Sequence, residues 1–507
     1  MSTNYDHSVF AVLSAMTGGR EMEKQTNQCV ATATSNRQRL VTFAAAFVLV
    51  LATSACGGGS SGSSDSSAAT ANQYDGCSNE GDVAKTSDGM PLQCVTNSVG
   101  ELMWDAAPTP TTLDAGSIAD STSTTMAMSG ASGAAAIPLS SIFRGDCDPN
   151  GPASYSAGIG DAQQWSHVVP LGAMVGTHVT PVDHIYVYYP KGSDNSAPGT
   201  FTVTSPADGT IVRVEDFQKT NGYPYPDYRI VIAHSCDLYS VFIHVGELQG
   251  PAAEAAADAS RNGSWSGNIA VKAGDVIADE SRSPNYDFST FATNAKVTLL
   301  NPDSYREKET WKPYTANPFD YFPAAITAAY EAKTLRTAAP VGGTIFYDVD
   351  GTAQGMWFVK GTNGYRGVGD ESAKFDNHGK VARGYWDTHL AFAPDNVDPS
   401  AFIYSIGDWE GCPCQFMSKG NVNPSSVKAG GQPTVVDLVE FEFIAPDGSR
   451  MDPSQPVRGY KLKAGNSVVG SVAFQVNDDG SMTVEKRPGK DATTFSGFSA
   501  DALTYVR

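Results

Sequence analysis

The most constraining feature of this sequence is a long series of short segments rich in Val, Ile, Tyr, Phe and Thr, separated by turns that contain Gly, Asp and Pro. HIYVYY at 184–189, TIVRV at 210–214 and YRIVIAH at 228–234 are examples, and PADG at 206–209 is one of the turns. Short runs of β-branched and aromatic residues between such turns are typical of strands. Because the pattern continues to the C-terminus, we predict a mainly β protein with few short helices.

The strand pattern divides into two regions, in keeping with the two to four domains that a chain of 507 residues usually forms. The first β domain is predicted over 136–310, with a short inserted helix in the Ala-rich stretch 251–262. A connecting helix is expected over 311–337, where Ile326 and Tyr330 have helical spacing. Residues 338–507 are predicted to form a second β-sandwich or a barrel.

The N-terminal part of the chain predicts export. Residues 40–55 form an apolar stretch that follows Arg37 and Arg39, and it is short for a membrane span but suits a secretory signal. It ends in T-S-A-C at Cys56, followed by a Gly/Ser tether over 56–73, which resembles a bacterial lipoprotein signal. The resemblance implies that residues 1–55 are a leader, that Cys56 is lipidated, and that the protein is exported and anchored to a bacterial membrane in the periplasm or at the cell surface.

The cysteines that remain after such processing are even in number, which favours disulfides in an exported protein. Cys77 and Cys94 lie in one short segment, so a small cysteine-stapled β module is predicted over 74–105, with a linker over 106–135. We expect Cys147 to pair with Cys236 and so tie the start of the first β domain to its central strands. The cysteines assigned to disulfides are Cys77, Cys94, Cys147, Cys236, Cys412 and Cys414.

The charge balance limits the partners. The chain has 34 Lys and Arg against 54 Asp and Glu, a formal net charge of −20. Such a chain offers no basic field to hold phosphates, so we predict that it does not bind nucleic acid. An acidic surface favours a cationic or neutral partner.

Four segments of the first β domain resemble a known enzyme family when they are taken in order. They are SPADGTIV at 205–212, YRIVIAH at 228–234, YSVFIHVGEL at 239–248 and VKAGDVIA at 271–278. The series is similar to the lysostaphin-like (LytM-type) zinc metallopeptidases, which cut peptide cross-links of the bacterial cell wall. The resemblance covers roughly 165–305 and implies a β-sandwich of the barrel-sandwich hybrid type.

In that family a His, an Asp and a second His hold zinc, and two further histidines are catalytic. Three ligands leave an open position where bound water becomes acidic enough to attack an amide. His244 matches one catalytic histidine, whereas Asn285 and Asp287 stand where the family has its His-x-His. Because Asn285 cannot exchange a proton near neutral pH, the resemblance implies a degenerate site.

The other zinc ligands would come from the segment THVTPVDHIY. His178, Asp183 and His184 are the candidates there, together with Asp287 on the later strand. Tyr286 and Asn285 would line a groove for the ligand. We expect no bound cofactor, with zinc as the alternative.

Together these features predict an exported, lipid-anchored cell-envelope protein. Its metallopeptidase-like domain would bind or scaffold peptidoglycan or another envelope ligand without cutting it. One alternative is an active zinc endopeptidase that cleaves peptidoglycan peptides. Another is a calcium-assisted adhesion protein, suggested by the acidic spacing of DVDGT at 348–352 and by Asp395 and Asp398 in a strand-end loop.

Overall fold

The structure is a computed structural model that describes four short strands between residues 69 and 106, and residues 137–190, 199–218, 225–295, 297, 299–368 and 384–507. The chain divides into two compact units, one of them Ala31–Gly130, and each is described by itself. Cys56 and Cys77 lie outside the described residues, as does the side chain of Cys94. No helix in the described part of the chain is long and apolar enough to cross a bilayer.

The smaller unit contains one four-stranded sheet in the order β1-β2-β3-β4. Its strands are β1 (Ala69–Thr70), β2 (Val83–Lys85), β3 (Pro91–Thr96) and β4 (Leu102–Ala106). β1 pairs with β2 in parallel, and the other pairs are antiparallel.

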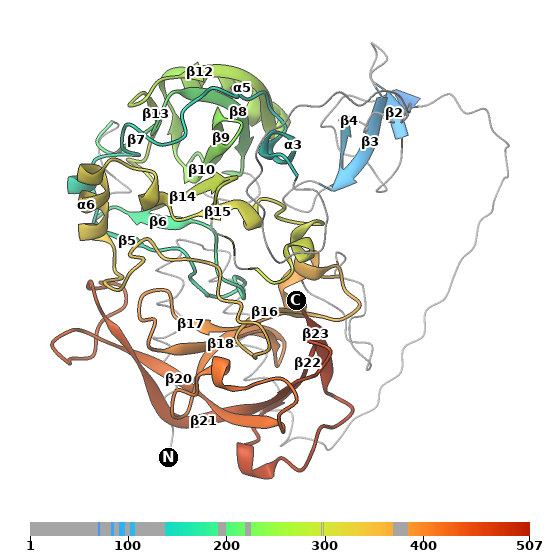
Figure 1. Ribbon diagram of the computed structural model, residues 1–507. Helices are drawn as coiled ribbons and strands as arrows, with labels where there is room; N and C mark the ends of the chain where they lie inside the picture. Colours follow the sequence, from blue (N-terminus) through green and yellow to red (C-terminus); the bar gives the residue numbers. More distant parts are fainter. Residues whose placement is uncertain are drawn as a thin grey trace, which may run out of the picture. The chain divides into compact units, whose positions relative to one another are not determined.

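The first domain of the larger unit is built on one open sheet in the order β12-β8-β9-β10-β14-β6-β5, with β15 paired to β14 (Figure 1). A second, three-stranded sheet has the order β11-β13-β7. The large sheet is formed by β5 (His167–Val169), β6 (Ile185–Tyr188), β8 (Gly209–Asp216), β9 (Tyr228–Ser235), β10 (Leu238–Val245), β12 (Ser264–Val271), β14 (Asn285–Ala292) and β15 (Thr315–Ala316). The small sheet is formed by β7 (Thr202–Thr204), β11 (Glu247–Leu248) and β13 (Val276–Asp279).

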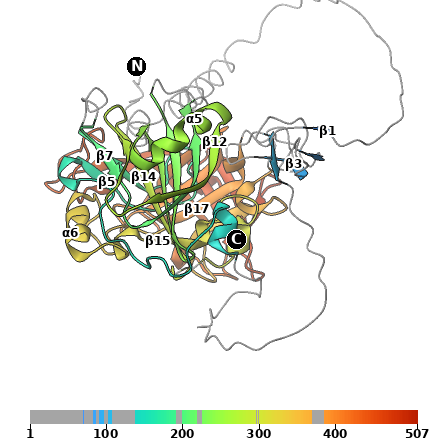
Figure 2. The ribbon, with the colours of Figure 1, turned by 90° about the horizontal axis from the view of Figure 1, so that it is seen from above.

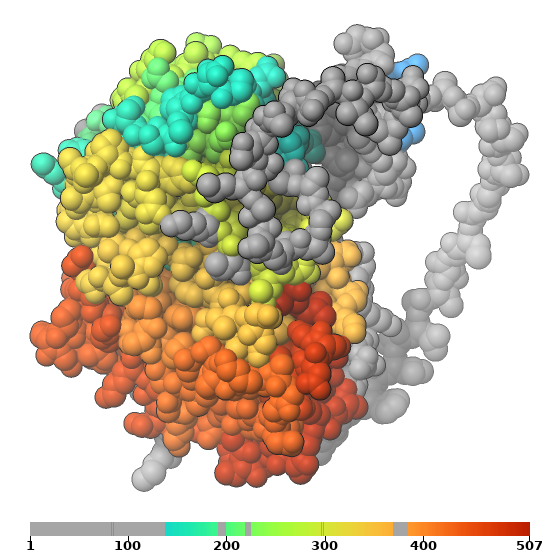
Figure 3. Space-filling model, in the orientation of Figure 1, coloured from blue at the N-terminus to red at the C-terminus, as the bar shows by residue number. Residues whose placement is uncertain are grey.

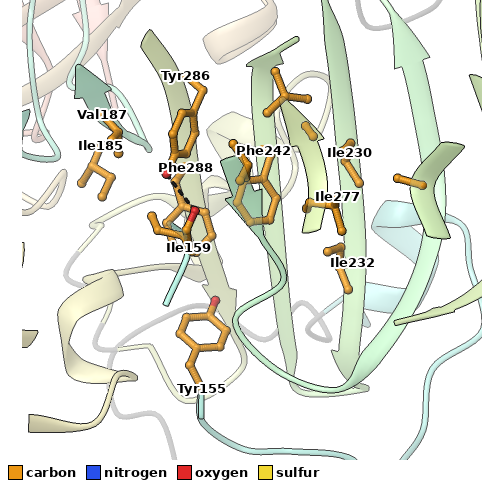
Figure 4. Close-up of a cluster of buried hydrophobic side chains, with 14 of the residues drawn as sticks. Tyr155, Ile159, Ile185, Val187, Ile230, Ile232, Phe242, Ile277, Tyr286 and Phe288 are labelled. Carbon is orange, nitrogen blue, oxygen red and sulfur yellow. Dashed lines mark hydrogen bonds between the residues drawn. The ribbon is translucent and has the colours of Figure 1, made fainter. Parts of the chain in front are cut away.

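The central strands of the large sheet are buried on both faces, which explains why apolar residues occur on both faces of each strand. All eight residues of β9 are buried. Ile230 and Ile232 face one core together with residues of the small sheet and α5, whereas Val231 and Ala233 face a second core. Figure 4 shows Ile230 and Ile232 directed towards Phe242 and Ile277 in the first core. Since side chains alternate along a strand, a covered sheet needs apolar residues at every position.

Three short α-helices are seen in the described part of this domain. α3 (Leu139–Phe143) covers the second core, where Phe143 stacks on Tyr239 with ring centroids 5.2 Å apart. The helix predicted over 251–262 forms as α5 (Ala253–Asn262), which lies beside β12 and β8 (Figure 2). Within the segment 311–337, α6 (Ala324–Lys333) follows β15 and two 3-10 turns at Lys312–Tyr314 and Pro318–Asp320.

The second domain is a closed antiparallel barrel of eight strands, β16 to β23 in sequence order. It consists of β16 (Gly355–Val359), β17 (His389–Pro394), β18 (Phe402–Trp409), β19 (Cys412–Ser418), β20 (Thr434–Ile444), β21 (Lys461–Val476), β22 (Met482–Pro488) and β23 (Leu503–Val506). Trp357, Phe392, Tyr404 and Phe474 are among the residues that fill it. The prediction of a mainly β chain with few short helices is therefore confirmed, and the C-terminal strands form a closed barrel.

The two β domains share a core of their own, and β6 contributes to both sides. Ile185 and Val187 face the core of the first domain, whereas Tyr186 and Tyr188 pack with Ile403 and other outward-facing residues of the barrel. In the space-filling view, the residues between the domains in sequence, drawn in yellow, lie between the green first domain and the orange barrel (Figure 3).

The outermost strand β12 is irregular. Its pairing with β8 shifts register between Ser266 and Ile269, which marks a β-bulge. A Cβ atom at Gly267 would lie 2.5 Å from the Trp265 side chain, so the indole fills the space that only glycine leaves.

Cys147 and Cys236 form a disulfide with an S–S distance of 1.98 Å, as the sequence predicts. It joins the segment after α3 to the turn between β9 and β10. The disulfide closes a long loop of the chain, which reduces the conformational freedom of the unfolded state.

We expect the double variant Cys147→Ser/Cys236→Ser to lose about 3–4 kcal/mol of unfolding free energy, because its unfolded chain regains that freedom. Chemical denaturation of the wild type and the variant, each with and without reductant, measures the loss. Reductant should lower the stability of the wild type more than that of the variant. An unfolding midpoint shared by wild type and variant without reductant would contradict the prediction.

Candidate functional site

Three neighbouring strands bring the site residues together. In the order β10-β14-β6, Asp287 of β14 is paired with Ile243 on one side and with Tyr186 on the other. His244 follows Ile243, and His184 immediately precedes β6, so both imidazoles reach the carboxylate between them. We call His178, Asp183, His184, Asp227, His244 and Asp287 the His–Asp cluster.

Both imidazoles face Asp287 through Nε2. His184 Nε2 lies 3.4 Å from Asp287 Oδ2, and His244 Nε2 lies 3.9 Å from the same oxygen. Asp287 is 3% exposed, and its Oδ1 makes no hydrogen bond. Burial raises the pKa of this carboxyl, although the two histidines oppose the shift.

The Nδ1 atom of each imidazole contacts a second carboxylate. His184 Nδ1 lies 3.1 Å from Asp183 Oδ1, and His244 Nδ1 lies 3.1 Å from Asp227 Oδ1. An ionised carboxylate only accepts hydrogen bonds, so in each pair the imidazole N–H donates. These contacts fix the ring orientations and direct both Nε2 atoms at Asp287.

His244 is held in an unusual backbone conformation. Its φ of 61° is in the left-handed region, next to a register shift between β9 and β10. Two residues on, the Gly246 N–H donates to Glu280 Oε1 at 2.6 Å, and Glu280 is fully buried. This turn leaves the His244 side chain 32% exposed, whereas the side chain of His184 is only 9% exposed. His244 is therefore the histidine of the pair that is open to a ligand.

His244 and His178 differ in charge. Burial lowers the pKa of His244, but Asp227 and then Asp287 outweigh it and raise the pKa to about 9. The pKa of His178 falls to about 3 through burial and the nearby His184 and Lys312. The His178 ring centroid is 6.0 Å from that of His184. At neutral pH the cluster thus presents a charged His244 and a neutral His178.

Asp183 is also held by the segment just before β15. Its Oδ2 accepts a 2.7 Å hydrogen bond from Trp311 Nε1, and Lys312 Nζ lies 3.9 Å away. Lys312 is 3% exposed and pairs with Glu309 at 3.1 Å. Burial raises the pKa of Asp183, but Lys312 and the hydrogen bonds from His184 and Trp311 hold it well below its usual range.

The remaining predicted residues lie on β14. Asn285 is 4% exposed and shares a sheet face with Asp287. Tyr286 is on the opposite face and fully buried, and its hydroxyl donates to the Ile159 carbonyl at 3.0 Å inside the core (Figure 4).

The acidic loops of the barrel bind their own chain. Asp348 Oδ1 accepts from the Met356 N–H and its Oδ2 from the Leu300 N–H. Asp395 Oδ1 accepts from the N–H groups of residues 397 and 398, and Asp398 pairs with Lys461 at 2.9 Å. These carboxylates stabilise turns and the strand end beside them.

The zinc site implied by the resemblance can be tested against these contacts. Two ligands of a tetrahedral zinc lie roughly 3.3–3.5 Å apart when each is about 2.0–2.2 Å from the ion. His184 Nε2 and Asp287 Oδ2 meet that spacing at 3.4 Å. Among the residues that the structure describes, however, no three His, Cys, Asp or Glu side chains are grouped so as to hold a metal ion. Both oxygens of Asp183 already accept hydrogen bonds from N–H donors. The arrangement therefore offers zinc two ligands, His184 and Asp287, and not three.

Sequence reasoning missed several residues of the site. Asp227 had a local signal, since it is a charged residue directly before the apolar strand β9. Trp311, Lys312 and Glu280 had none, because their contacts join parts of the chain that are far apart in sequence.

Comparisons with known proteins give little further guidance. No family model matches the chain, and no curated protein matches it. The NMR solution structure of lysostaphin is similar with a TM-score of 0.20 and 11% sequence identity, over 54% of this chain and 96% of that one. A likeness of this size carries no argument, so function has to be argued from the residues themselves.

We expect Asp227→Asn to lower the pKa of His244 from about 9, because the carboxylate that raises it most is removed while burial still disfavours the charged ring. NMR titration of the imidazole C–H resonances measures this pKa. Asp216→Asn is the matched control, since Asp216 lies at the end of β8 and accepts from the Gln218 N–H. A His244 pKa that stays near 9 in Asp227→Asn would contradict the prediction.

The same pair predicts how stability depends on pH. Because the folded pKa of His244 is above its unfolded value of 6.5, its contribution is fully present below about 6.5 and is lost as the pH rises through about 9. The difference in unfolding free energy between wild type and Asp227→Asn should therefore shrink between pH 6.5 and pH 9.5. Denaturation across this range measures it, and a constant difference would argue against the pairing.

Proposed function

We propose that this protein is an exported, lipid-anchored cell-envelope protein whose first β domain binds peptides of the cell wall without cutting them. The observation that carries the proposal is that other residues of the same chain already contact the Asp183 carboxylate of the His–Asp cluster. Trp311 and His184 occupy the two oxygens of Asp183, and the buried ammonium of Lys312 supplies positive charge beside it. With Asp183 occupied in this way, the cluster lacks a third metal ligand, which favours recognition over metal-dependent chemistry.

The ligand-binding group in this proposal is His244. Its imidazole is charged at neutral pH and is the partly exposed member of the pair. A fixed cation of this kind suits a free carboxylate, and the peptides of peptidoglycan carry such groups. The neutral His178 beside it adds a polar group without further charge.

Purified peptidoglycan sacculi test the binding. We expect the wild type to sediment with sacculi and His244→Ala to bind at least 10-fold more weakly, because the exposed cation is lost. His167→Ala is the matched control, since His167 stacks on Tyr188 outside the His–Asp cluster. A wild type that stays in the supernatant, or equal loss in both variants, would count against the proposal.

The lipid anchor is part of the same proposal and rests on the sequence around Cys56. Cells grown with a radioactive fatty acid should label the wild type and not Cys56→Ser. Cys29→Ser serves as the control and should keep the label. Label retained in Cys56→Ser would remove the anchor from the proposal.

An active zinc endopeptidase is the second candidate, and one observation favours it. His184 Nε2 and Asp287 Oδ1 are buried and make no hydrogen bond, although polar atoms in such places normally have a partner. If zinc binds, His184 and Asp287 would hold it, and the ion would supply an acidified water for amide hydrolysis.

Metal analysis separates the two candidates. After equilibration with equimolar zinc and removal of free metal, we expect less than about 0.1 zinc per chain, because only two ligands have the spacing that zinc requires. About one zinc per chain, lost in His184→Ala and in Asp287→Ala but kept in His167→Ala, would establish the peptidase candidate instead.

A further inference from the structure

The loop that carries His178 is closed by its own backbone. It joins β5 to β6 and ends at Asp183 and His184. Val175 and His178 exchange two backbone hydrogen bonds of 3.0 and 2.9 Å, and Gly172 N–H donates to the Val182 carbonyl at 2.9 Å. The tip of the loop therefore moves as one piece, and the position of that piece sets the position of the His178 ring.

The barrel holds this loop through two amide side chains. Gln415 of β19 makes two hydrogen bonds with the backbone of a single residue, Gly176. Its Oε1 accepts from Gly176 N–H at 3.0 Å, and its Nε2 donates to the Gly176 carbonyl at 3.1 Å. Asn396, in the loop between β17 and β18, donates through Nδ2 to the Pro170 carbonyl at 2.9 Å. The loop is thus held at its start and at its tip.

Apolar contacts fix the barrel side of this arrangement. Ala173 and Val182 of the loop pack in one cluster with Ile403 and Phe441 of the barrel. Gln415 is itself oriented, because its Nε2 also donates to Ser405 Oγ on the neighbouring strand at 3.2 Å. Because the Gln415 side chain is fixed on the closed barrel, its hydrogen bonds to Gly176 set the position of the loop relative to the barrel.

We propose that the barrel is the positioning half of the site and that Gln415 is its positioning residue, setting the place of His178 through Gly176. The proposal rests on the proposed function for the nature of the ligand. It gives the C-terminal domain a role, because the peptide site is then assembled from both domains. Gln415 acts only through the loop, and His178, whose ring lies 6.0 Å from that of His184, is the side chain that the loop positions beside the His–Asp pair.

Gln415→Ala tests the proposal against Gln475→Ala. Gln475 is the matched control because its Nε2 donates to the Gly431 carbonyl at 2.8 Å, a contact within the barrel. We expect Gln415→Ala to bind sacculi about 10-fold more weakly and to shift the NMR resonances of His178. Gln475→Ala should bind as the wild type does, and both variants should have similar melting temperatures.

A double variant distinguishes positioning from a general structural role. If Gln415 acts through His178, His178→Ala/Gln415→Ala binds sacculi no more weakly than His178→Ala, since the effects are not additive. Additive losses would overturn the proposal, as would wild-type binding with unshifted His178 resonances in Gln415→Ala.

Failure of the proposed function gives a different pattern. If the wild type does not bind sacculi, hydrogen exchange of the amides of residues 175–178 and the His178 resonances still test the positioning. Faster exchange and shifted resonances in Gln415→Ala, but not in Gln475→Ala, support it. Unchanged exchange and resonances overturn it even if Gln415→Ala unfolds more easily.

Discussion

The burial of β6 on both faces is the constraint on which the rest of the larger unit depends. Ile185 and Val187 pack into the first domain, and Tyr186 and Tyr188 pack against the barrel. A strand that is apolar on both sides is stable only when both sides are covered, because each buried side chain contributes about 1.5–3 kcal/mol. The first domain therefore needs the barrel to cover this strand.

The site inherits its geometry from the same strand. Asp183 and His184 directly precede β6, so whatever fixes β6 also fixes the carboxylate and imidazole that face Asp287. Gln415 of the barrel is hydrogen-bonded to the preceding loop, and Trp311, in the segment just before β15, donates a hydrogen bond to Asp183. Three distant parts of the chain thus converge on one pair of residues. The geometry of the His–Asp cluster and the packing of the barrel on β6 are consequently linked in this protein.

Local sequence patterns predicted the strands and not what covers them. The alternation in HIYVYY indicates a strand whichever side faces solvent, so Tyr186 and Tyr188 could not be assigned to the barrel in advance. The pairing of Cys147 with Cys236 was predictable because the number of candidate cysteines was small. Of the His–Asp cluster, the histidines and Asp287 could be chosen by residue type and spacing. Lys312 and Gln415 could not be chosen, because nothing in the local sequence around a lysine or a glutamine indicates a partner more than 100 residues away.

The closed barrel and the bulged strand β12 also bear on how this chain avoids others of its kind. A closed barrel has no edge strand, so in the described part of the larger unit the edge strands belong to the two sheets of the first domain, of which the large sheet has the longer edges. At the β5 end, the Val168 carbonyl accepts from Leu335 N–H at 2.9 Å. At the other end, the bulge of β12 and the Trp265 ring against Gly267 interrupt a regular template. Edge-to-edge pairing between copies is therefore discouraged at both ends of the large sheet.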